Sequence, residues 1–203
     1  MPMELAMLIQ ILIMLGLFER YHCCYLDPPW DINQKGKYGA EKHYDLMTLE
    51  QIRNLPIPQL TSQNSHVWLW VPNGLIPQGL ELLKEWGFTY RSPFYWVKPR
   101  MGLGNYLRNA SEVVLLGTRG KAPVLFRGQP NWGFFPLQDH SHKPEEMYDI
   151  IERLSPGPYL ELFARRHRPG WDSWGKEIDS DIYIPGYPVP TYSDKAILPK
   201  EGA

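Results

Sequence analysis

Cysteine is almost absent from the sequence: the 203 residues contain two, Cys23 and Cys24, and these are neighbours. One adjacent pair excludes a disulfide framework and a cysteine-rich zinc site. Because neighbouring cysteines rarely bridge each other, we expect the protein to reside in a reducing compartment. The sequence also lacks a cluster of His, Cys and Asp at metal-ligand spacing, so no metal is expected.

An excess of charge of one sign is lacking as well. Lys and Arg total 21 and Asp and Glu total 22, which gives a net charge of -1 and excludes a generally basic, histone-like binder. The 20 prolines and 17 glycines exclude a long coiled coil or a helical repeat array. What is present is an apolar share of 43% in a chain of single-domain length, which is enough for a sizeable core.

Long hydrophobic runs are limited to one segment near the start, Leu5 to Phe18. A bilayer needs about 20 apolar residues, so this run is too short to span one, and no basic residues precede it as in a secretory signal. We expect residues 1–20 to form an apolar helix that packs on the core or on a partner. If the partner is a second copy of the chain, the protein is a homo-oligomer. A membrane contact and a wrongly assigned gene start are the alternatives.

Segments with the pattern of buried strands alternate with segments of helical pattern. The expected strands are residues 66–71, 94–97, 112–117 and 159–164, and the expected helices are residues 48–52, 74–86 and 143–154. Thr48 and Gln51 fit a capping box, and Gly87 fits the position after a helix. This alternation predicts an α/β fold with a mainly parallel sheet flanked by helices. Residues 179–203 are rich in Pro and Tyr, lack periodicity and predict an extended or disordered tail.

One short motif, Asp27-Pro28-Pro29-Trp30, follows a short β-prone run that ends at Tyr25-Leu26, at the end of a sheet where α/β proteins bind ligands. The Asp27 carboxylate and the Pro28 carbonyl can accept hydrogen bonds from an amino group, and Pro29 has no N–H to compete. The ring of Trp30 can stack on a flat ligand. The motif therefore suits an exocyclic amine on a nucleobase, although a proline-stiffened turn with a buried Trp would read the same way.

Five sequence blocks favour the nucleobase-binding interpretation of the motif. In order they are DPPWDI, WVKP, GLGNYLRNASEVVLLGTRGK, HSHKPEEMYDIIERLSPGPYLELFARR and GWDSWGKE, within Tyr25 to Ile178. Their order and spacing closely resemble the family of the seventy-kilodalton mRNA adenosine methyltransferase subunit, which has phage and bacterial members. The resemblance implies a Rossmann-like, circularly permuted methyltransferase fold over residues 21–178, with S-adenosylmethionine as methyl donor. It also implies a cytoplasmic protein of a bacterium or a phage-infected cell.

The resemblance implies which residues hold the methyl donor. They are Lys143, Glu161, Phe163, Arg165, His167, Lys176 and Glu177. A solvated helix-start lysine and a surface histidine are the alternatives for Lys143 and His167. The family often has Asn where Lys176 stands. Larger members also carry a segment ahead of the DPPW block that helps to hold the donor's adenine, whereas this chain has 26 residues there.

A basic segment runs from Arg91 to Gly128. It contains seven basic residues and one acid, so its net charge is +6 in a chain of net charge -1. Basic charge mixed with aromatic rings suits a phosphate backbone and unstacked bases, although a plain basic loop face is the alternative. The expected substrate contacts in and around this segment are Tyr44, Trp70, Lys98, Arg100 and Arg108. Trp70 ends a buried strand and fits the core equally well.

These observations predict an enzyme that methylates the exocyclic amino group of adenine in nucleic acid, with DNA favoured. An RNA adenosine methyltransferase and a non-catalytic partner that binds nucleic acid are the alternatives. Chemistry on a base requires that base to leave the duplex or to be single-stranded already. Hydrogen bonds from the amino group to Asp27 and to the Pro28 carbonyl would localise the nitrogen lone pair for attack on the methyl group.

Overall fold

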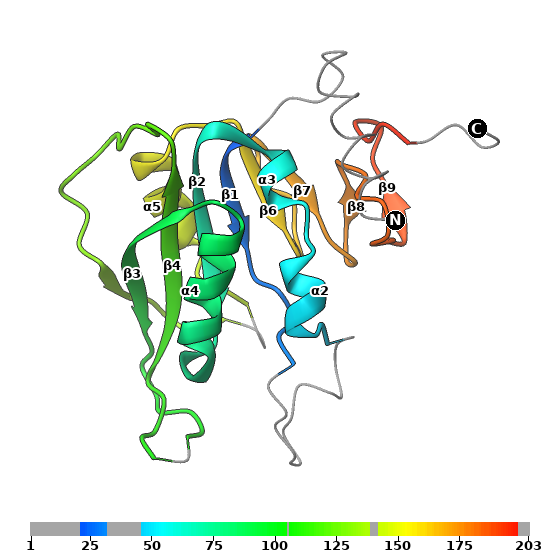
Figure 1. The fold of residues 1–203 in the computed structure, drawn as a ribbon. Coiled ribbons are helices and arrows are strands. Elements are labelled where there is room, and N and C mark those ends of the chain that lie inside the picture. Colours follow the sequence, from blue (N-terminus) through cyan, green and yellow to red (C-terminus); the bar gives the residue numbers. More distant parts are fainter. Residues whose placement is uncertain (1–20, 32–45, 105, 139–141, 199–203) are drawn as a thin grey trace. The chain divides into compact units, whose positions relative to one another are not determined.

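The structure is a computed structural model that describes residues 21–31, 46–104, 106–138 and 142–198 (Figure 1). The chain divides into two units: residues up to Ser62 together with those from Pro158 form the first, and Gln63–Gly157 form the second. The apolar segment 1–20 and Tyr44 lie outside the described residues. The boundaries expected at residues 20 and 178 stay predictions.

Three parallel strands form the sheet of the first unit. They are β1 (Tyr21–Leu26), β6 (Tyr159–Leu162) and β7 (Trp171–Trp174), in the order β1-β6-β7 (Figure 1). Leu26 is in register with Leu162, which is in register with Trp174. All three are buried. Because the strands are parallel and end together, whatever follows them starts from one edge of the sheet.

Two short helices accompany this sheet, α2 (Leu49–Arg53) and α3 (Ile57–Leu60). The capping box predicted at α2 is confirmed, because the Gln51 N–H donates to the Thr48 hydroxyl at 3.2 Å and the Thr48 N–H donates to the Gln51 side chain at 2.8 Å. Ile52 and Ile57 bury the inner faces of these helices.

The C-terminal segment, residues 179–198, belongs to the first unit and is ordered. It contains the parallel pair β8 (Asp179–Ser180) and β9 (Thr191–Tyr192). Its buried residues are Ser180, Asp181, Ile182, Ile184 and Val189. The sequence left open an extended or a disordered tail; for residues 179–198 the disordered alternative is wrong, because these side chains are held by tertiary contacts that local periodicity does not show.

The sheet of the second unit has the order β5-β3-β4-β2, with strands β2 (Thr61–Val71), β3 (Thr89–Val97), β4 (Ser111–Arg119) and β5 (Trp132–Phe134). β4 runs antiparallel to both β2 and β3, whereas β3 and β5 are parallel. Of the five strand pairings described in the two sheets, three are parallel.

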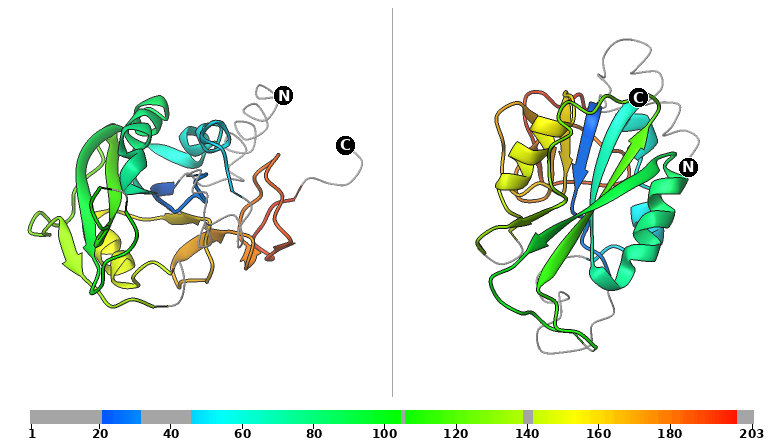
Figure 2. Two further views of the ribbon diagram at one scale, coloured as in Figure 1. Left: turned by 90° about the horizontal axis from the view of Figure 1, so that it is seen from below. Right: turned by 90° about the vertical axis from the view of Figure 1, so that its left-hand side faces the viewer.

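Alternate residues of β2 point to opposite faces of the sheet and contact two different helices of the second unit. A Cβ on Gly79 of α4 (Ile76–Glu85) would come within 2.7 Å of Val71, so α4 packs directly on one face. On the other face, the Trp68 indole donates to Ser155, which follows α5 (Glu146–Leu154). Figure 2 shows α4 and α5 on opposite sides of these strands. A 3-10 turn, Asn73–Leu75, leads into α4.

The sequence placed the core of the second unit correctly. The segment 66–71 was expected to be buried on both faces, and every residue of it is buried. The predicted glycine after α4 is confirmed, since Gly87 has φ 81°, a backbone conformation that disfavours side chains. Among the described residues, no helix has the length and apolar character needed to cross a membrane.

Candidate active site

The residues expected to do the chemistry start from one edge of the first unit's sheet. Asp27 follows the last residue of β1, Phe163 follows β6 and Gly175 follows β7. The registered ends of these parallel strands bring the three positions to the same edge. This is where open α/β sheets bind ligands.

The Asp27-Pro28-Pro29-Trp30 turn is fixed by backbone hydrogen bonds. The Trp30 N–H donates to the Pro28 carbonyl at 2.9 Å, and the Met47 N–H donates to the Pro29 carbonyl at 2.8 Å. A carbonyl oxygen has two lone pairs, so the Pro28 oxygen can accept a second hydrogen bond from a ligand. Asp27 and Pro29 are partly exposed, whereas Trp30 is 6% exposed. The Trp30 ring therefore packs within the protein, as in the alternative reading, and its stacking role stays a prediction.

Phe163 has an unusual backbone at this edge. Its φ is 66°, the only positive value among the described residues other than glycine. Such a conformation costs free energy in a residue with a side chain, and it clusters at functional sites. The ring meets Trp174 edge-on, with centroids 5.4 Å apart. The turn thereby directs the chain away from β6 and into the Arg165–His167 stretch.

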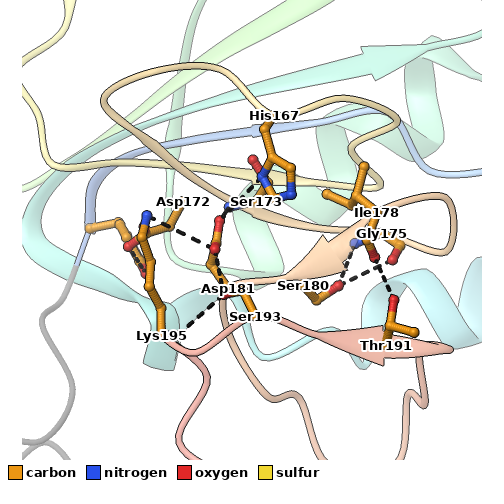
Figure 3. Close-up of polar contacts among 11 residues, drawn as sticks. His167, Asp172, Ser173, Gly175, Ile178, Ser180, Asp181, Thr191, Ser193 and Lys195 are labelled. Atoms are coloured by element: carbon orange, nitrogen blue, oxygen red, sulfur yellow. Dashed lines mark hydrogen bonds and ion pairs between the residues drawn. The ribbon is translucent and has the colours of Figure 1, made fainter.

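Beyond β6 and β7, three of the seven expected donor residues line a hollow, whereas Lys143, Glu161, Phe163 and Arg165 are not part of its lining. Its volume is about 400 Å³, and its lining is His167, Lys176, Glu177, Ile178, Asp179 and Thr191. Arg165 donates from Nε to Glu177 Oε1 at 2.8 Å, which links the two loops that carry the lining. Figure 3 shows the His167 side chain directed toward Asp181; Nδ1 and Oδ2 are 3.7 Å apart. The hollow is shallow and largely open to solvent, although its volume falls within the range of small-ligand sites, roughly 300–1,000 Å³.

Glu161 lies inside the sheet. It is in register with Tyr25 of β1 and Ser173 of β7, and it is 9% exposed. Burial raises the pKa of the nearby Cys24 thiol, and Cys23 and Glu161 raise it further. The thiol therefore stays protonated at neutral pH and is no nucleophile.

In the second unit, two expected ligand-binding lysines share one carboxylate. Lys98 forms an ion pair with Glu112 Oε1, and Lys143 lies 3.0 Å from Glu112 Oε2. Burial alone would raise the pKa of Glu112, but the ammonium groups of Lys143 and Lys98 outweigh that effect and lower it. We call Lys98, Glu112 and Lys143 the lysine–glutamate cluster; its formal charge is +1.

The lysine–glutamate cluster lies against two indole rings. The Lys143 ammonium is 5.0 Å from the centroid of Trp70, and the Lys98 ammonium is 4.6 Å from that of Trp96. Trp70 is 2% exposed and meets Trp96 edge-on at 6.3 Å. Of the two readings that the sequence left open for Trp70, the structure places it in the core, and its role against adenine stays a prediction.

The loop between β3 and β4 displays the other expected substrate contacts. Its ends are joined by the Lys98 N–H, which donates to the Ala110 carbonyl at 2.8 Å, and Asn73 donates to Asn109 at 3.2 Å. Arg100 and Arg108 are exposed on it. Large apolar side chains are exposed there too: Met101, Leu103, Tyr106 and Leu107. A basic loop with exposed apolar and aromatic groups can bind both phosphates and unstacked bases.

Four residues of these sites were not foreseen from the sequence. Glu112 was counted as a lone acid in a basic segment, Ile178 was given no role, and Asp179 and Thr191 were assigned to a tail. For the tail a signal was present: Ile182 and Ile184 alternate with other residues, as in a half-buried strand. For Glu112 no local signal exists, because Lys143 is distant in sequence. Among the described residues, no three His, Cys, Asp or Glu side chains gather as metal ligands.

A comparison with protein families shows to which family the chain belongs. The sequence pattern of MT-A70 matches residues 21–177, which include every described candidate site residue named from the sequence. The chain belongs to the MT-A70 family. The match ends before Asp179, so the C-terminal segment lies outside the part of this MT-A70 protein that the family defines.

Relatives of this MT-A70 protein fall into two groups. The Type II methyltransferase M.MunI of Mycoplasma sp is 31% identical over 193 residues, which cover 82% of each chain. The N(6)-adenosine-methyltransferase MT-A70-like protein of Drosophila melanogaster is 35% identical over 165 residues, and the N(6)-adenosine-methyltransferase catalytic subunit METTL3 of Homo sapiens is 34% identical over 176 residues. The chain spans 26% and 29% of the lengths of these two proteins.

Family membership confirms three expectations from the sequence: the resemblance itself, the α/β Rossmann-like methyltransferase fold, and an enzyme that methylates the amino group of adenine. The roles expected for individual residues stay predictions.

Proposed function

We propose that this protein transfers the methyl group of S-adenosylmethionine to the exocyclic amino nitrogen of adenine in DNA. One observation carries the proposal: Asp27 and the loops that line the hollow leave the same edge of a three-stranded parallel sheet. DNA is favoured over RNA because the relative that matches over most of both chains is the Type II methyltransferase, whereas the adenosine methyltransferases match over about a quarter of their lengths.

The hollow suits the donor because its lining offers both charges and an apolar side chain. Glu177 can accept hydrogen bonds from sugar hydroxyls, and Lys176 can pair with a carboxylate. When bound, the donor supplies a methyl group on a positively charged sulfur. The exposed ion pair between Arg165 and Glu177 connects the two lining loops.

Asp27 and the Pro28 carbonyl hold the adenine amino group in this proposal. The nitrogen is a poor nucleophile because its lone pair is delocalised into the ring. Two acceptors aimed at its hydrogens favour a pyramidal nitrogen with a localised lone pair. Most of the acceleration then comes from positioning and preorganised electrostatics, and no strong base is needed.

The exposed Arg100 and Arg108 supply the phosphate contacts in this proposal, on the loop that Lys98 joins to the lysine–glutamate cluster. Two guanidinium groups on one surface loop release counterions when they meet a nucleic-acid backbone. This role accounts for a strongly positive segment in a protein of net charge -1.

The experiment is methyl transfer from labelled S-adenosylmethionine to separate pools of double-stranded DNA, single-stranded DNA and RNA. We expect label in N6-methyladenine of DNA, and none with Asp27→Ala. Label in RNA alone would show that the substrate is RNA, as the names of the N(6)-adenosine-methyltransferase relatives indicate for those proteins. No label in any pool, with nucleic-acid binding retained, would mean a non-catalytic partner and would overturn the proposal.

A further inference from the structure

We propose that the C-terminal segment, which lies outside the family match, forms one wall of the donor site and binds the nucleoside half of the donor. The inference rests on the proposed function, since it assumes that the hollow is the donor site. It adds residues that neither the family match nor the sequence assigned: Asp179 of β8 and Thr191 of β9.

The first observation is the composition of the wall. His167, Lys176 and Glu177 come from the family-defined part of the chain, whereas Asp179 and Thr191 come from the C-terminal segment. Asp179 and Thr191 are in register across the β8–β9 pair, so they present one continuous strip. Without β8 and β9 this side of the hollow would be open.

The second observation is that the wall is anchored to the sheet. The Asp181 N–H donates to the Ser173 carbonyl at 2.7 Å, and the Ser173 N–H donates back to the Asp181 carboxylate at 2.9 Å. The Gly175 N–H donates to the Ser180 hydroxyl at 3.0 Å. Figure 3 shows these contacts joining β7 to the segment that follows it. A wall held in this way is formed before a ligand arrives.

The third observation connects the wall to a predicted donor contact. Buried Asp181 accepts a hydrogen bond from the Ser193 hydroxyl at 2.7 Å, and its other oxygen lies 3.7 Å from His167 Nδ1. At 3.7 Å the carboxylate places a negative charge beside His167 but does not hold the ring by a hydrogen bond. Asp181 serves to anchor the segment that carries the wall, through Ser173 and Ser193.

The two carboxylates of the lining suit the nucleoside half of the donor, while Lys176 beside them supplies a cation for the donor's carboxylate. Glu177 and Asp179 place two carboxylates on the hollow. Carboxylates accept hydrogen bonds from vicinal sugar hydroxyls and from a purine amino group. Ile178 adds an apolar side chain for the base.

The test places a large side chain in the hollow at a position of the wall. Thr191 is exposed on a two-residue strand, so Thr191→Trp should obstruct the hollow while the core stays packed. By isothermal titration calorimetry we expect its affinity for S-adenosylhomocysteine, and for adenosine, to fall about tenfold or more. The matched control is Asp194→Trp, an exposed position of the same segment that does not line the hollow. It should bind as the unaltered protein does, and both variants should keep their melting temperatures.

A second measurement uses the unaltered protein. Hydrogen exchange should slow in residues 179–193 when S-adenosylhomocysteine binds, and methionine should produce no such protection. If S-adenosylhomocysteine binds but neither protects this segment nor loses affinity in Thr191→Trp, the wall is overturned and the proposed function stands. If S-adenosylhomocysteine does not bind the unaltered protein at all, the proposed function and the wall both fail.

Discussion

Asp27 combines two properties that a substrate-holding carboxylate needs. It follows a strand end that is fixed by its register with Leu162, and its side chain stays partly exposed. Replacing it with alanine should abolish methyl transfer and leave the affinity for S-adenosylhomocysteine unchanged, because the proposed function assigns the carboxylate to the acceptor amine and not to the donor.

The measurement for Asp27→Ala is the single-turnover rate together with donor affinity by calorimetry. A rate above about a tenth of the wild-type value would correspond to a barrier increase below about 1.4 kcal/mol, too little for the assigned role. The control is Asp31→Ala, an exposed carboxylate just beyond the motif.

His66 makes stability depend on pH. It is fully buried, its Nδ1 lies 2.7 Å from the Ser155 hydroxyl, and burial lowers its pKa below the ordinary 6.5. Below pH 6.5 the unfolded chain therefore binds a proton that the folded chain resists. Stability should fall as pH drops from 7.5 through 6.5 toward the folded-state pKa, by at most about 1.4 kcal/mol per pH unit from this group.

Urea denaturation at pH 7.5 and 5.5 checks this prediction. For each protein, the quantity compared is the change in unfolding free energy between pH 7.5 and pH 5.5. His66→Asn lacks the titrating group, so this change should be smaller in the variant than in the wild type. An equal change in the two proteins would show that other groups cause the pH dependence.

At the scale of elements, the loop between β3 and β4 carries the expected phosphate contacts. Neutralising Arg100 and Arg108 together should weaken binding to DNA and flatten its salt dependence, because each lost contact lowers the slope of log affinity against log salt by about 0.7–0.9. Fluorescence anisotropy at several salt concentrations measures the slope. Lys84→Gln, an exposed lysine on α4, is the control, and an unchanged slope in the arginine variant would place the loop away from DNA.

Elements that depend on nearby residues were predictable from the sequence. The capping box of α2, the glycine after α4 and the buried segment 66–71 all follow from spacings of a few residues. The C-terminal segment was not predictable as an ordered wall, because its order rests on contacts such as that between Asp181 and Ser173. The three-residue β5 is too short to show a period.

The site divides in the same way. The Asp27 motif was visible because its four residues are consecutive and follow a strand. The lysine–glutamate cluster was visible only in part. Lys98 was named from the basic segment and Lys143 through the family resemblance, whereas Glu112 acquires its role from two partners that the fold brings to it. Distances of this kind are set by strand pairing, which the sequence pattern does not specify.

At the scale of the whole molecule, the apolar run Leu5 to Phe18 predicts an association with protein or lipid. Burying one Leu or Ile side chain contributes roughly 1.5–3 kcal/mol, so an apolar run of this length should be covered by protein or lipid. Deleting residues 1–17 should change the oligomeric state or the solubility and leave the activity of the Asp27 site intact. Light scattering that gives a monomer with and without the segment would rule out a partner.

The reversal of β4 has a consequence for how the enzyme can diversify. Because β4 returns antiparallel to β3, the loop between them leaves and re-enters the sheet at one place, where Val97 is in register with Ser111. Neither strand has to shift when the intervening residues are exchanged for others of different length or chemistry. We therefore expect that residues of this loop can be exchanged to alter target preference while the strands and the Asp27 site stay as they are.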